Sequence, residues 1–435
     1  MLKKLKVRET QIEIAAPTLA QPEPALNLKN GRLKRLELLW LTNKEAFLIW
    51  LGWRVVFIFF PVFAGLLFPH ATGVGLPGPN PNAGLERWFG GWMHWDGGWY
   101  VEVAARGYQG DNTAAFYPLY LLLLRGLAFV FTLGNISDDA LNITGVILSS
   151  LAALTTCLLL YQLACQDYDQ ETARLSVLYL MAFPTAFFLF AVYTEALFMA
   201  LAIGAFYAAR KNRWLIALLL AALAVLTKNQ GLLLVAALLV EYVVQQRPCR
   251  FRPDYRIFFF GLPLLTFGGW LLFNQLTFGN PLQFLSANQQ YWGHYFAWPW
   301  QVLAKAAADF KRILNSTVGP GTELMQQDYL NLVSFPLTIG FVGLAFAGGW
   351  AVWRGRLRLA YLVFFLGCLL QPLVSPVAEQ PLLSMPRYLL VIFPAFFLLA
   401  LAGRNWRIIH YSYLAFSLPL LGLLLARFVL WYWAS

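Results

Sequence analysis

Long apolar blocks separated by short polar connections dominate the chain from residue 46 onward. A helix of about 20 apolar residues crosses the roughly 30 Å hydrocarbon core of a bilayer, so each block of that length predicts a transmembrane helix. The pattern predicts an all-α polytopic membrane protein with about eleven crossings. The expected crossings are residues 46–69, 116–133, 141–164, 176–209, 214–227, 230–246, 256–275, 330–352, 357–375, 386–402 and 408–433.

Two of these blocks are interrupted by polar or helix-breaking residues. Block 176–209 contains Phe-Pro-Thr at 183–185 and would be about 50 Å long as one straight helix, so it is either one broken span or two short ones. If the block forms two spans, segment 116–133 has to be re-entrant or interfacial. The reason is that an odd number of crossings must separate the outer loop that ends near residue 115 from the cytoplasmic cluster that begins at Arg210. Block 214–246 is interrupted at 227–231, which predicts two short helices that meet at an outside turn.

Basic residues predict the orientation in the membrane. The 32 Lys and Arg residues exceed the 21 Asp and Glu residues, which leaves a net charge of +11. Lys and Arg gather in short cytoplasmic loops of membrane proteins, so topology rather than a nucleic-acid partner explains the excess. We expect residues 1–45 to be a basic cytoplasmic segment and 46–435 to form the membrane domain, with extracytoplasmic loops at 70–115 and 276–329. The expected cytoplasmic clusters lie at Arg210 to Arg213, Arg247 to Arg256, Arg354 to Arg358, and Arg404 to Arg407.

Composition excludes several classes of protein. With 59% hydrophobic and 12% charged residues, the chain is neither a soluble enzyme nor a disordered protein. Four cysteines without a CxxC pair support neither a disulfide framework nor a zinc site. The first 45 residues lack an apolar core, so the first crossing is expected to serve as an uncleaved anchor. No GxGxxG, Walker or GxSxG motif is present, so no nucleotide-binding domain is expected.

The first outer loop holds the densest unusual composition, WFGGWMHWDGGWYVEVAARGY from Trp88 to Tyr108. The four tryptophans at 88, 92, 95 and 99 recur at helical spacing and would share one face if the stretch is helical. An aromatic belt that anchors an interfacial helix explains them without any substrate. Trp95 and Trp99 are also candidates to stack on a sugar.

Asp96 stands among these tryptophans, and an aromatic belt needs no acid. A carboxylate beside aromatic rings at a membrane surface is partly desolvated, which raises its basicity and suits it to accept a proton from a sugar hydroxyl. His94, two residues away, is a candidate to hydrogen-bond a substrate hydroxyl, although a lone histidine is more often structural. No HxxxH or DxD pair accompanies them, so no metal site is expected.

Ionisable residues inside apolar blocks are expensive and mark candidate sites. Glu195 lies within block 176–209, Lys228 interrupts block 214–246, and Arg387 begins a further block. Lys228 and Arg387 are placed on the outer side with Asp96, where two cations are able to hold a phosphate. The second outer loop carries amides and aromatics typical of carbohydrate-contacting surfaces, and Trp292 is its first candidate.

Six motifs in order resemble the PIG-V-like mannosyltransferase family of GT-C-type integral membrane glycosyltransferases. The motifs are HWDGGWYVEVAARGY, AAFYPLYLLLLR, FPTAFFLFAVYTEALF, TKNQGLLL, FGNPLQFLSANQQYWGH and SMPRYLLVIFPAF, within residues 46–402. The resemblance implies a GT-C-like bundle and a polyprenyl-phosphate-linked sugar donor, usually mannose. It implies that Asp96 is the general base, that Glu195 and His294 contact substrate, and that the helix breaks near Pro184. The family often has an arginine followed by proline near TKNQG, where this chain has Lys228 and Asn229.

These observations predict a membrane glycosyltransferase that transfers mannose, with inversion, from a polyprenyl-phosphate donor to a lipid or glycan acceptor. Lys228 and Arg387 would bind the donor phosphate, and no cofactor beyond the donor is expected. The expected location is a bacterial inner membrane with the site facing outward, or the lumenal side of the endoplasmic reticulum in a eukaryote. Membrane lipids and an accessory membrane subunit are the expected partners. The alternatives are a lipid-linked-sugar flippase without transferase chemistry and a non-catalytic membrane scaffold.

Overall fold

The computed structural model describes residues 28–69, 71, 89–246, 254–315 and 326–434. The chain divides into two units, residues 1–42 and 43–435. The described residues of the first unit are helical and form the start of α1 (Leu28–Leu67), whose remaining residues belong to the second unit. Every other element belongs to the second unit.

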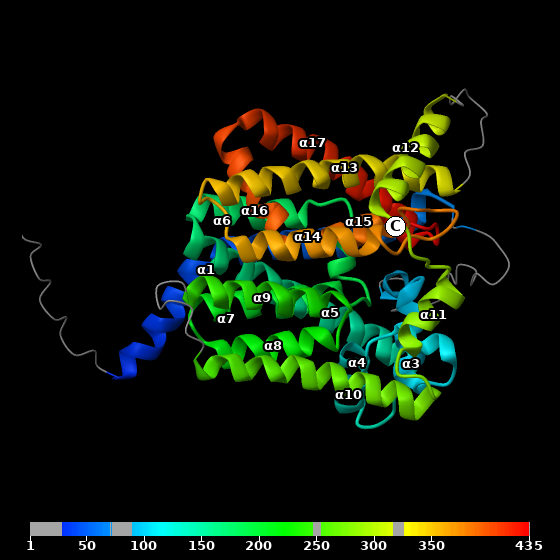
Figure 1. Cartoon of the computed structure of the whole chain (residues 1–435), viewed down its shortest axis with the longest axis horizontal. Helices are drawn as coiled ribbons and strands as arrows, with labels where there is room; N and C mark the ends of the chain where they lie inside the picture. Colours follow the sequence, from blue (N-terminus) through cyan, green and yellow to red (C-terminus); the bar gives the residue numbers. More distant parts are fainter. Residues whose placement is uncertain (1–27, 70, 72–88, 247–253, 316–325, 435) are drawn as a thin grey trace, which may run out of the picture. The chain divides into compact units, whose positions relative to one another are not determined.

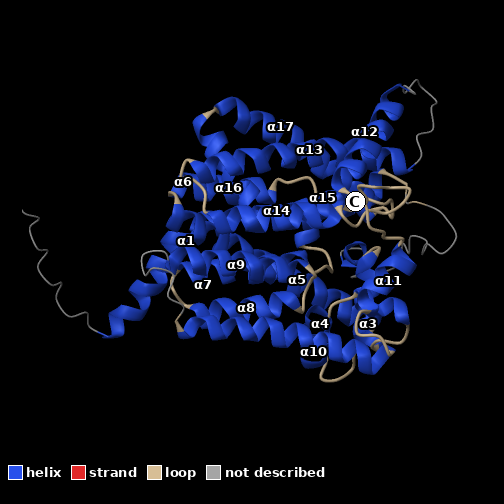
Figure 2. Ribbon diagram, in the orientation of Figure 1, coloured by secondary structure: helices blue, strands red, loops and turns tan. Residues whose placement is uncertain are grey.

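The described residues form an all-α polytopic membrane protein, as the apolar blocks predicted, and contain one isolated bridge between His294 and Val377 but no strand (Figure 2). After α1 the elements are η1 (Gly90–Met93), α3 (Asp96–Arg106), η2 (Asp111–Ala115), α4 (Pro118–Phe131), α5 (Asp138–Asp167), α6 (Gln170–Met181), η3 (Ala186–Leu189), α7 (Glu195–Arg210), α8 (Trp214–Val225), α9 (Gln230–Gln246), η5 (Tyr255–Phe260), α10 (Gly261–Phe278), α11 (Gln283–Trp292), α12 (Pro299–Asn315), α13 (Gln326–Trp353), α14 (Leu359–Leu373), α15 (Met385–Leu390), α16 (Phe393–Asn405) and α17 (Arg407–Val429).

Five helical stretches among the described residues are long and apolar enough to cross a membrane. Four shorter apolar helices, α4, α8, α9 and α14, accompany them. The number of crossings therefore stays a prediction, because length and composition alone do not place the shorter helices in the bilayer. The five long stretches are Trp40–Leu67, Asp138–Asp167, Tyr255–Phe278, Leu330–Trp353 and Arg407–Val429.

Block 176–209 is broken, as Pro184 predicted. Helix α6 ends at Met181, a short 3₁₀ turn follows, and α7 begins only at Glu195. The irregular segment between the two helices is buried throughout. Non-helical backbone at membrane depth persists only where the surrounding protein satisfies its hydrogen bonds, and here the Val192 amide donates to the Trp92 carbonyl at 2.9 Å. The break therefore ties the α6–α7 segment to the first outer loop.

Block 214–246 forms the expected pair of short helices, with α8 and α9 joined by a tight turn at 226–229. A Cβ on Gly231 would lie 2.5 Å from backbone atoms of Val225, so only glycine permits this close approach of the two helices. The turn also accepts a hydrogen bond from α4, since the Leu119 amide donates to the Leu226 carbonyl at 2.9 Å. Lys228 is therefore held on a packed turn.

In the second unit, the connections that carry basic clusters and the segments of the predicted outer loops lie at opposite ends of the helices. The connections α7–α8, α13–α14 and α16–α17, which hold three of the predicted basic clusters, lie at the left end in Figure 1. Helices α3, α11 and α12, from the two predicted outer loops, lie at the right end (Figure 1). The separation agrees with the charge pattern.

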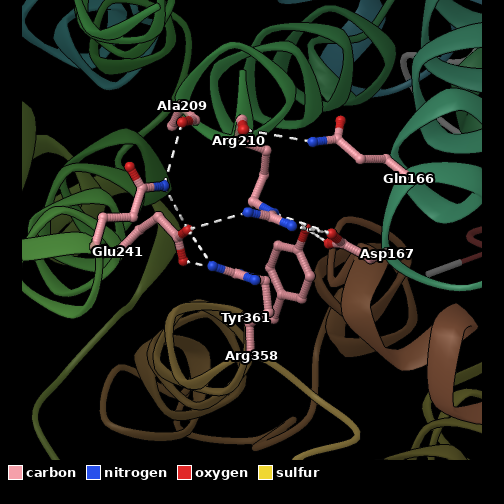
Figure 3. A network of polar contacts seen from close by, with 8 residues as sticks. Gln166, Asp167, Ala209, Arg210, Glu241, Arg358 and Tyr361 are labelled. Atoms are coloured by element: carbon pink, nitrogen blue, oxygen red, sulfur yellow. Dashed lines mark hydrogen bonds and ion pairs between the residues drawn. The ribbon is translucent and has the colours of Figure 1, made fainter. Parts of the chain in front are cut away.

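A buried polar network joins α5, α7, α9 and the start of α14 (Figure 3). Glu241 is 1% exposed and accepts two hydrogen bonds from Arg358, at 2.7 and 3.1 Å, while Arg210 lies 4.0 Å away. Arg210 pairs with Asp167 at 2.6 Å, and the Tyr361 hydroxyl donates to the same carboxylate at 2.5 Å. Two carboxylates and two guanidinium groups thus neutralise one another between four helices.

Removing one charge from this network is expected to destabilise the protein. Glu241→Gln leaves Arg358 without its counter-charge, and breaking a buried ion pair costs about 3–5 kcal/mol. We expect a clear loss of thermal stability of the purified protein in detergent, measured as the temperature at which the monodisperse gel-filtration peak disappears.

The matched control is Glu171→Gln, which removes a carboxylate whose side chain is 47% exposed and pairs with Arg174. Exposed pairs contribute about 0–1 kcal/mol, so this variant should resemble the wild type. Equal stability of the two variants would show that the buried network does not hold the four helices.

Candidate active site

Asp96 begins α3 directly after a residue with an unusual backbone conformation. Trp95 has φ 59° and ψ −124°, which side-chain-bearing residues seldom adopt, so the chain turns sharply before the helix. A Cβ on Gly97 would lie 3.4 Å from the ring of Tyr193, so the first turn of α3 is packed against the segment between α6 and α7. The carboxylate therefore sits at the positive end of a short helix, beside the α6–α7 break.

Three ionisable side chains from separate parts of the chain meet beside Asp96. The Asp96 carboxylate lies 2.6 Å from an Arg387 guanidinium nitrogen, and Lys228 Nζ lies 2.5 Å from Glu195 Oε1. Arg387 Nε lies 3.6 Å from the same Glu195 oxygen and links the two pairs. The cluster has two positive and two negative charges, which is how buried charges are tolerated in a low-dielectric interior.

Aromatic rings surround the two cations of this cluster. The Arg387 guanidinium lies 5.8, 5.4 and 5.8 Å from the ring centroids of Phe188, Tyr193 and Tyr388. Lys228 Nζ lies 5.5 Å from the Tyr388 ring. Ring faces attract cations, so these side chains help hold both groups in place. Burial lowers the pKa of Lys228 from its ordinary value, and the neighbouring Glu195 carboxylate opposes that shift.

Two polar atoms of the cluster are buried and have no hydrogen-bond partner among the described residues. They are Glu195 Oε2 and Arg387 Nε. Glu195 is 1% exposed, so its second carboxylate oxygen is shielded from bulk water while the first oxygen faces both cations. Buried polar atoms without partners are rare and often mark a place where a ligand completes the network. Glu195 also lines the cavity next to the cluster, where such a ligand would lie.

A cavity of about 130 Å³ adjoins the four charges. Six of the nine residues expected at the site from the sequence line it, although they come from positions up to 291 residues apart. These six are Asp96, Glu195, Lys228, Trp292, His294 and Arg387. The remaining lining residues are Tyr100, Ala115, Phe116, Tyr117, Thr227, Asn229, Asn288, Leu383, Ser384, Tyr388 and Trp433.

His294 enters the cavity wall from the loop after α11. Its Nδ1 lies 2.7 Å from the carbonyl oxygen of Ser375, so Nδ1 donates and Nε2 is left as the acceptor nitrogen. Burial lowers the pKa of His294 from its ordinary value, and the hydrogen bond to Ser375 opposes that shift. The imidazole is therefore expected to be neutral at pH 7 and suited to accept a hydrogen bond from a hydroxyl group.

Three expected residues lie behind the cavity wall. His94 is buried, bonds the Phe428 carbonyl at 2.9 Å and stacks on Trp431 at 3.7 Å, so its contacts are structural. Trp95 packs edge-on against Trp433 at 4.6 Å. Trp99 packs against Trp292 at 6.4 Å and is 39% exposed. Trp95 and Trp99 thus pack against residues that line the cavity, and none of the three side chains lines it.

The expectation that the tryptophans share one helical face is wrong for the described residues. Trp92 lies in η1, Trp95 precedes α3 and Trp99 lies inside α3, because the sharp turn at Trp95 interrupts the helix. Trp88 lies outside the described residues.

Sequence reasoning missed the contribution of the C-terminal segment after α17. Trp433 lines the cavity, and its carbonyl accepts a hydrogen bond from Arg427 Nε at 3.2 Å. The Tyr432 amide returns to the Arg427 carbonyl at 2.8 Å, which folds the segment back on the end of α17. An aromatic run at a chain end resembles a membrane-interface anchor, so no local signal distinguished Trp433 as part of a site.

The assembled groups suit an anionic, hydroxyl-bearing ligand. Two cations offer charge-assisted hydrogen bonds to an anion, and two carboxylates with a neutral imidazole accept hydrogen bonds from hydroxyl groups. Trp292 and Trp433 supply flat apolar surface on the same wall. Within the described ranges, no group of three or more His, Cys, Asp or Glu side chains is placed to hold a metal ion.

Comparison with known proteins agrees with this geometry. Residues 60–247 match the family model described as mannosyltransferase (PIG-V). This segment contains Asp96, Glu195 and Lys228, whereas Trp292, His294 and Arg387 lie beyond it. No solved structure matches the chain significantly, so the expected GT-C-like architecture stays a prediction.

Three curated relatives align with parts of the chain. GPI mannosyltransferase 2 of Drosophila pseudoobscura pseudoobscura is 31% identical over 30% of this chain and 30% of its own length. GPI mannosyltransferase 2 of Drosophila melanogaster is 29% identical over 26% of each chain. GPI alpha-1,6-mannosyltransferase 2 of Rattus norvegicus is 27% identical over 46% of this chain and 42% of its own length. The alignments thus span less than half of each relative. Together with the family match, they confirm the resemblance that the ordered motifs indicated: residues 60–247 resemble the PIG-V mannosyltransferases.

Proposed function

We propose that this protein transfers mannose from a polyprenyl-phosphate-linked donor to a hydroxyl group of a lipid or glycan acceptor, with inversion at the sugar carbon. One observation carries the proposal: Asp96 and the two cations Lys228 and Arg387 line the same cavity. A carboxylate able to accept a proton and two cations able to hold a phosphate are the groups that this reaction requires.

The donor phosphate would bind between Lys228 and Arg387. Its negative charge increases as the bond between the sugar carbon and the phosphate oxygen breaks, so cations placed there stabilise the transition state more than the bound donor. Both cations are already ordered by Glu195, which lies 2.5 and 3.6 Å from them. Glu195 thus holds the phosphate site ready before the donor arrives.

Asp96 would act as the general base. The acceptor oxygen forms a bond to the sugar carbon, its proton passes to Asp96, and polyprenyl phosphate leaves with the electron pair of the broken carbon–oxygen bond. Asp96 is paired with Arg387 at 2.6 Å. A donor phosphate that binds Arg387 would compete for this contact, and the carboxylate would then be available to the acceptor hydroxyl.

The other lining groups would position the sugar. Trp292 and Trp433 offer surfaces for stacking on its apolar face, and His294 offers an acceptor for one hydroxyl. The unpartnered Glu195 Oε2 would accept a hydrogen bond from a second hydroxyl. Sites that hydrogen-bond a particular hydroxyl reject sugars that lack it, so these groups are expected to select the donor sugar.

A large apolar groove beside the cavity supports a donor with a lipid tail. The groove has a volume of about 600 Å³ and lies between α3, α4, the end of α8 and α10. Tyr117 and Thr227 line the polar cavity, and their neighbours Pro118 and Leu226 line the groove, so the two spaces adjoin. Burial of a prenyl chain contributes about 0.8 kcal/mol per CH₂ group. A tail in the groove would place the phosphate at the cations.

The charge pattern supports one orientation of the protein in the membrane. The basic connections lie at one end of the second unit, and α3 and α11, which hold Asp96 and Trp292, lie at the other (Figure 1). With the basic connections in the cytoplasm, as the positive-inside rule favours, the cavity opens on the extracytoplasmic side. We expect a periplasmic or exterior site in a bacterial inner membrane, or a lumenal site in the endoplasmic reticulum.

Replacing the base is expected to abolish transfer without unfolding the protein. Asp96→Asn keeps the shape and a hydrogen-bond acceptor for Arg387 but removes the proton acceptor, so transfer should fall by about 10²- to 10⁴-fold. The assay measures radiolabelled mannose passed from polyprenyl-phosphate-mannose to a membrane lipid extract by the purified protein.

Glu102→Gln is the control, because Glu102 lies on the same helix with its side chain 48% exposed and outside the cavity. It should transfer at the wild-type rate. Wild-type transfer by Asp96→Asn would exclude it as the base, and loss of transfer in both variants would point to damage of α3. Movement of the donor across vesicles without sugar transfer would indicate a flippase instead.

Removing a phosphate-binding cation is expected to weaken donor binding. Lys228→Gln and Arg387→Gln each remove a charge-assisted hydrogen bond, which should raise the donor KM by about tenfold to a hundredfold. Arg387→Lys tests the geometry, since it keeps the charge but loses the planar fork. Binding of unlabelled polyprenyl phosphate, measured by competition, separates the phosphate effect from the chemistry.

Lys305→Gln is the matched control, because Lys305 bonds the Ala378 carbonyl near α12 and does not line the cavity. Its donor KM should match that of the wild type. If Lys228→Gln and Arg387→Gln also keep the wild-type KM, the phosphate does not bind between these cations.

Filling the apolar groove is expected to discriminate donors by tail length. Gly269 lines the groove, and a Cβ there would meet open space, so Gly269→Phe should fold and occupy the tail position. We expect the KM for a long-chain donor to rise about tenfold, the effect of losing about two buried CH₂ groups. A donor with a short tail should respond less. Gly268→Phe is the control, since Gly268 also has open space but does not line the groove. Equal effects of the two substitutions would place the tail elsewhere.

A further inference from the structure

A second large groove lies on the membrane domain, away from the proposed active site. It has a volume of about 460 Å³ and is formed by α5, α7 and α8. None of its lining residues belongs to the cavity with Asp96 or to the groove beside α10. The volume falls within the range of sites that hold small molecules.

Small residues of α7 form the floor of this groove. Ala200, Gly204 and Ala208 are four residues apart and lie on one face of the helix. A Cβ on Gly204 would lie 3.3 Å from both Leu159 and Leu220, so the walls approach the helix backbone closely. The groove therefore exists because small side chains of α7 lie between larger side chains of α5 and α8.

The outer walls of the groove face the lipid. Leu151 of α5 is 57% exposed and Ile216 of α8 is 46% exposed. Both belong to apolar helices, and exposed apolar side chains on such helices contact the hydrocarbon of the bilayer. The groove is thus accessible to a lipid chain from within the membrane.

One end of the groove is basic. Lys211 and Arg213 line it there and are exposed, and Lys211 Nζ lies 5.0 Å from the ring of Tyr207. Among the described residues neither cation forms an ion pair with an acidic side chain, whereas the neighbouring Arg210 pairs with Asp167. Both cations belong to the α7–α8 connection, at the end of the second unit opposite α3 and α11 (Figure 1).

An apolar groove that ends at two unpaired cations complements one kind of membrane molecule. We propose that the groove binds an anionic glycerophospholipid, with its phosphate headgroup on Lys211 and Arg213 and one acyl chain between α5, α7 and α8. Basic pockets at the ends of membrane helices bind anionic lipid headgroups, and each cation near the surface contributes to that attraction. The site is separate from the donor groove, because the two share no lining residue.

Bound lipid is expected to stabilise the protein. A ligand that binds only the folded state raises the unfolding temperature, and the increase grows with the logarithm of the ligand concentration above its Kd. A lipid between α5, α7 and α8 would also fill space that otherwise separates these helices from the bilayer. The proposal does not depend on the transferase activity, so a binding measurement tests it directly.

Native mass spectrometry of the purified, delipidated full-length protein in neutral detergent measures the binding. Phosphatidylglycerol is titrated against phosphatidylcholine, and inorganic phosphate is added in a separate arm to compete. We expect retention of one phosphatidylglycerol and about 30-fold weaker binding after Lys211→Gln with Arg213→Gln, since two cations are lost. Thermal unfolding with and without lipid provides a second measurement on the same samples.

Two further variants test the groove and the charge. Thr155→Phe fills the groove from an exposed position and should weaken binding while the cations remain. Arg354→Gln with Arg356→Gln removes two exposed cations from the α13–α14 connection at the same end and should leave binding unchanged. Equal binding of phosphatidylcholine, an unchanged affinity in the Lys211 and Arg213 variant, or displacement of the lipid by inorganic phosphate alone would overturn the proposal.

Discussion

The neutral cluster of Asp96, Arg387, Glu195 and Lys228 is the constraint on which the site depends. Each of these charges would be costly in a membrane domain by itself, so each needs the others within a few ångströms. The cluster joins α3, α7, the α8–α9 turn and α15, and thereby fixes four segments that are far apart in the chain. The same pairing that makes the charges tolerable also places a carboxylate beside two cations.

The surrounding backbone is irregular for the same reason. Glu195 reaches the cluster because α6 ends at Met181 and α7 begins afresh at Glu195. Lys228 reaches the cluster from the turn between α8 and α9. Arg387 reaches it from a six-residue helix that follows Ser384, a residue with a positive φ. Continuous membrane helices satisfy their own backbone hydrogen bonds, but they offer few positions from which side chains of several segments can meet in one cluster. Broken helices provide those positions where neighbouring segments satisfy the freed backbone groups.

The two charge systems of the membrane domain differ in a way that matches their proposed roles. The network around Glu241 is closely satisfied, with two hydrogen bonds from Arg358 and further bonds at Asp167 (Figure 3). The cluster around Glu195 leaves Glu195 Oε2 and Arg387 Nε without partners, next to a cavity. Full satisfaction rigidifies a structure, whereas an incomplete network beside a cavity is where a substrate can supply the missing partners.

The sequence by itself determined the class of the protein, the breaks at Pro184 and at 227–231, and the candidate residues Asp96, Lys228 and Arg387. These features can be read from the sequence because proline acts on the local backbone. The bilayer also imposes the same requirements on every segment, namely a minimum apolar length and a high cost for isolated charges. Only the tertiary structure decided that Trp433 lines the cavity, that His94 packs against Trp431 behind it, and that Glu195 holds both cations. Those outcomes depend on contacts between residues tens to hundreds of positions apart, and nothing in the local pattern around each residue specifies which distant partner the folded chain will bring to it.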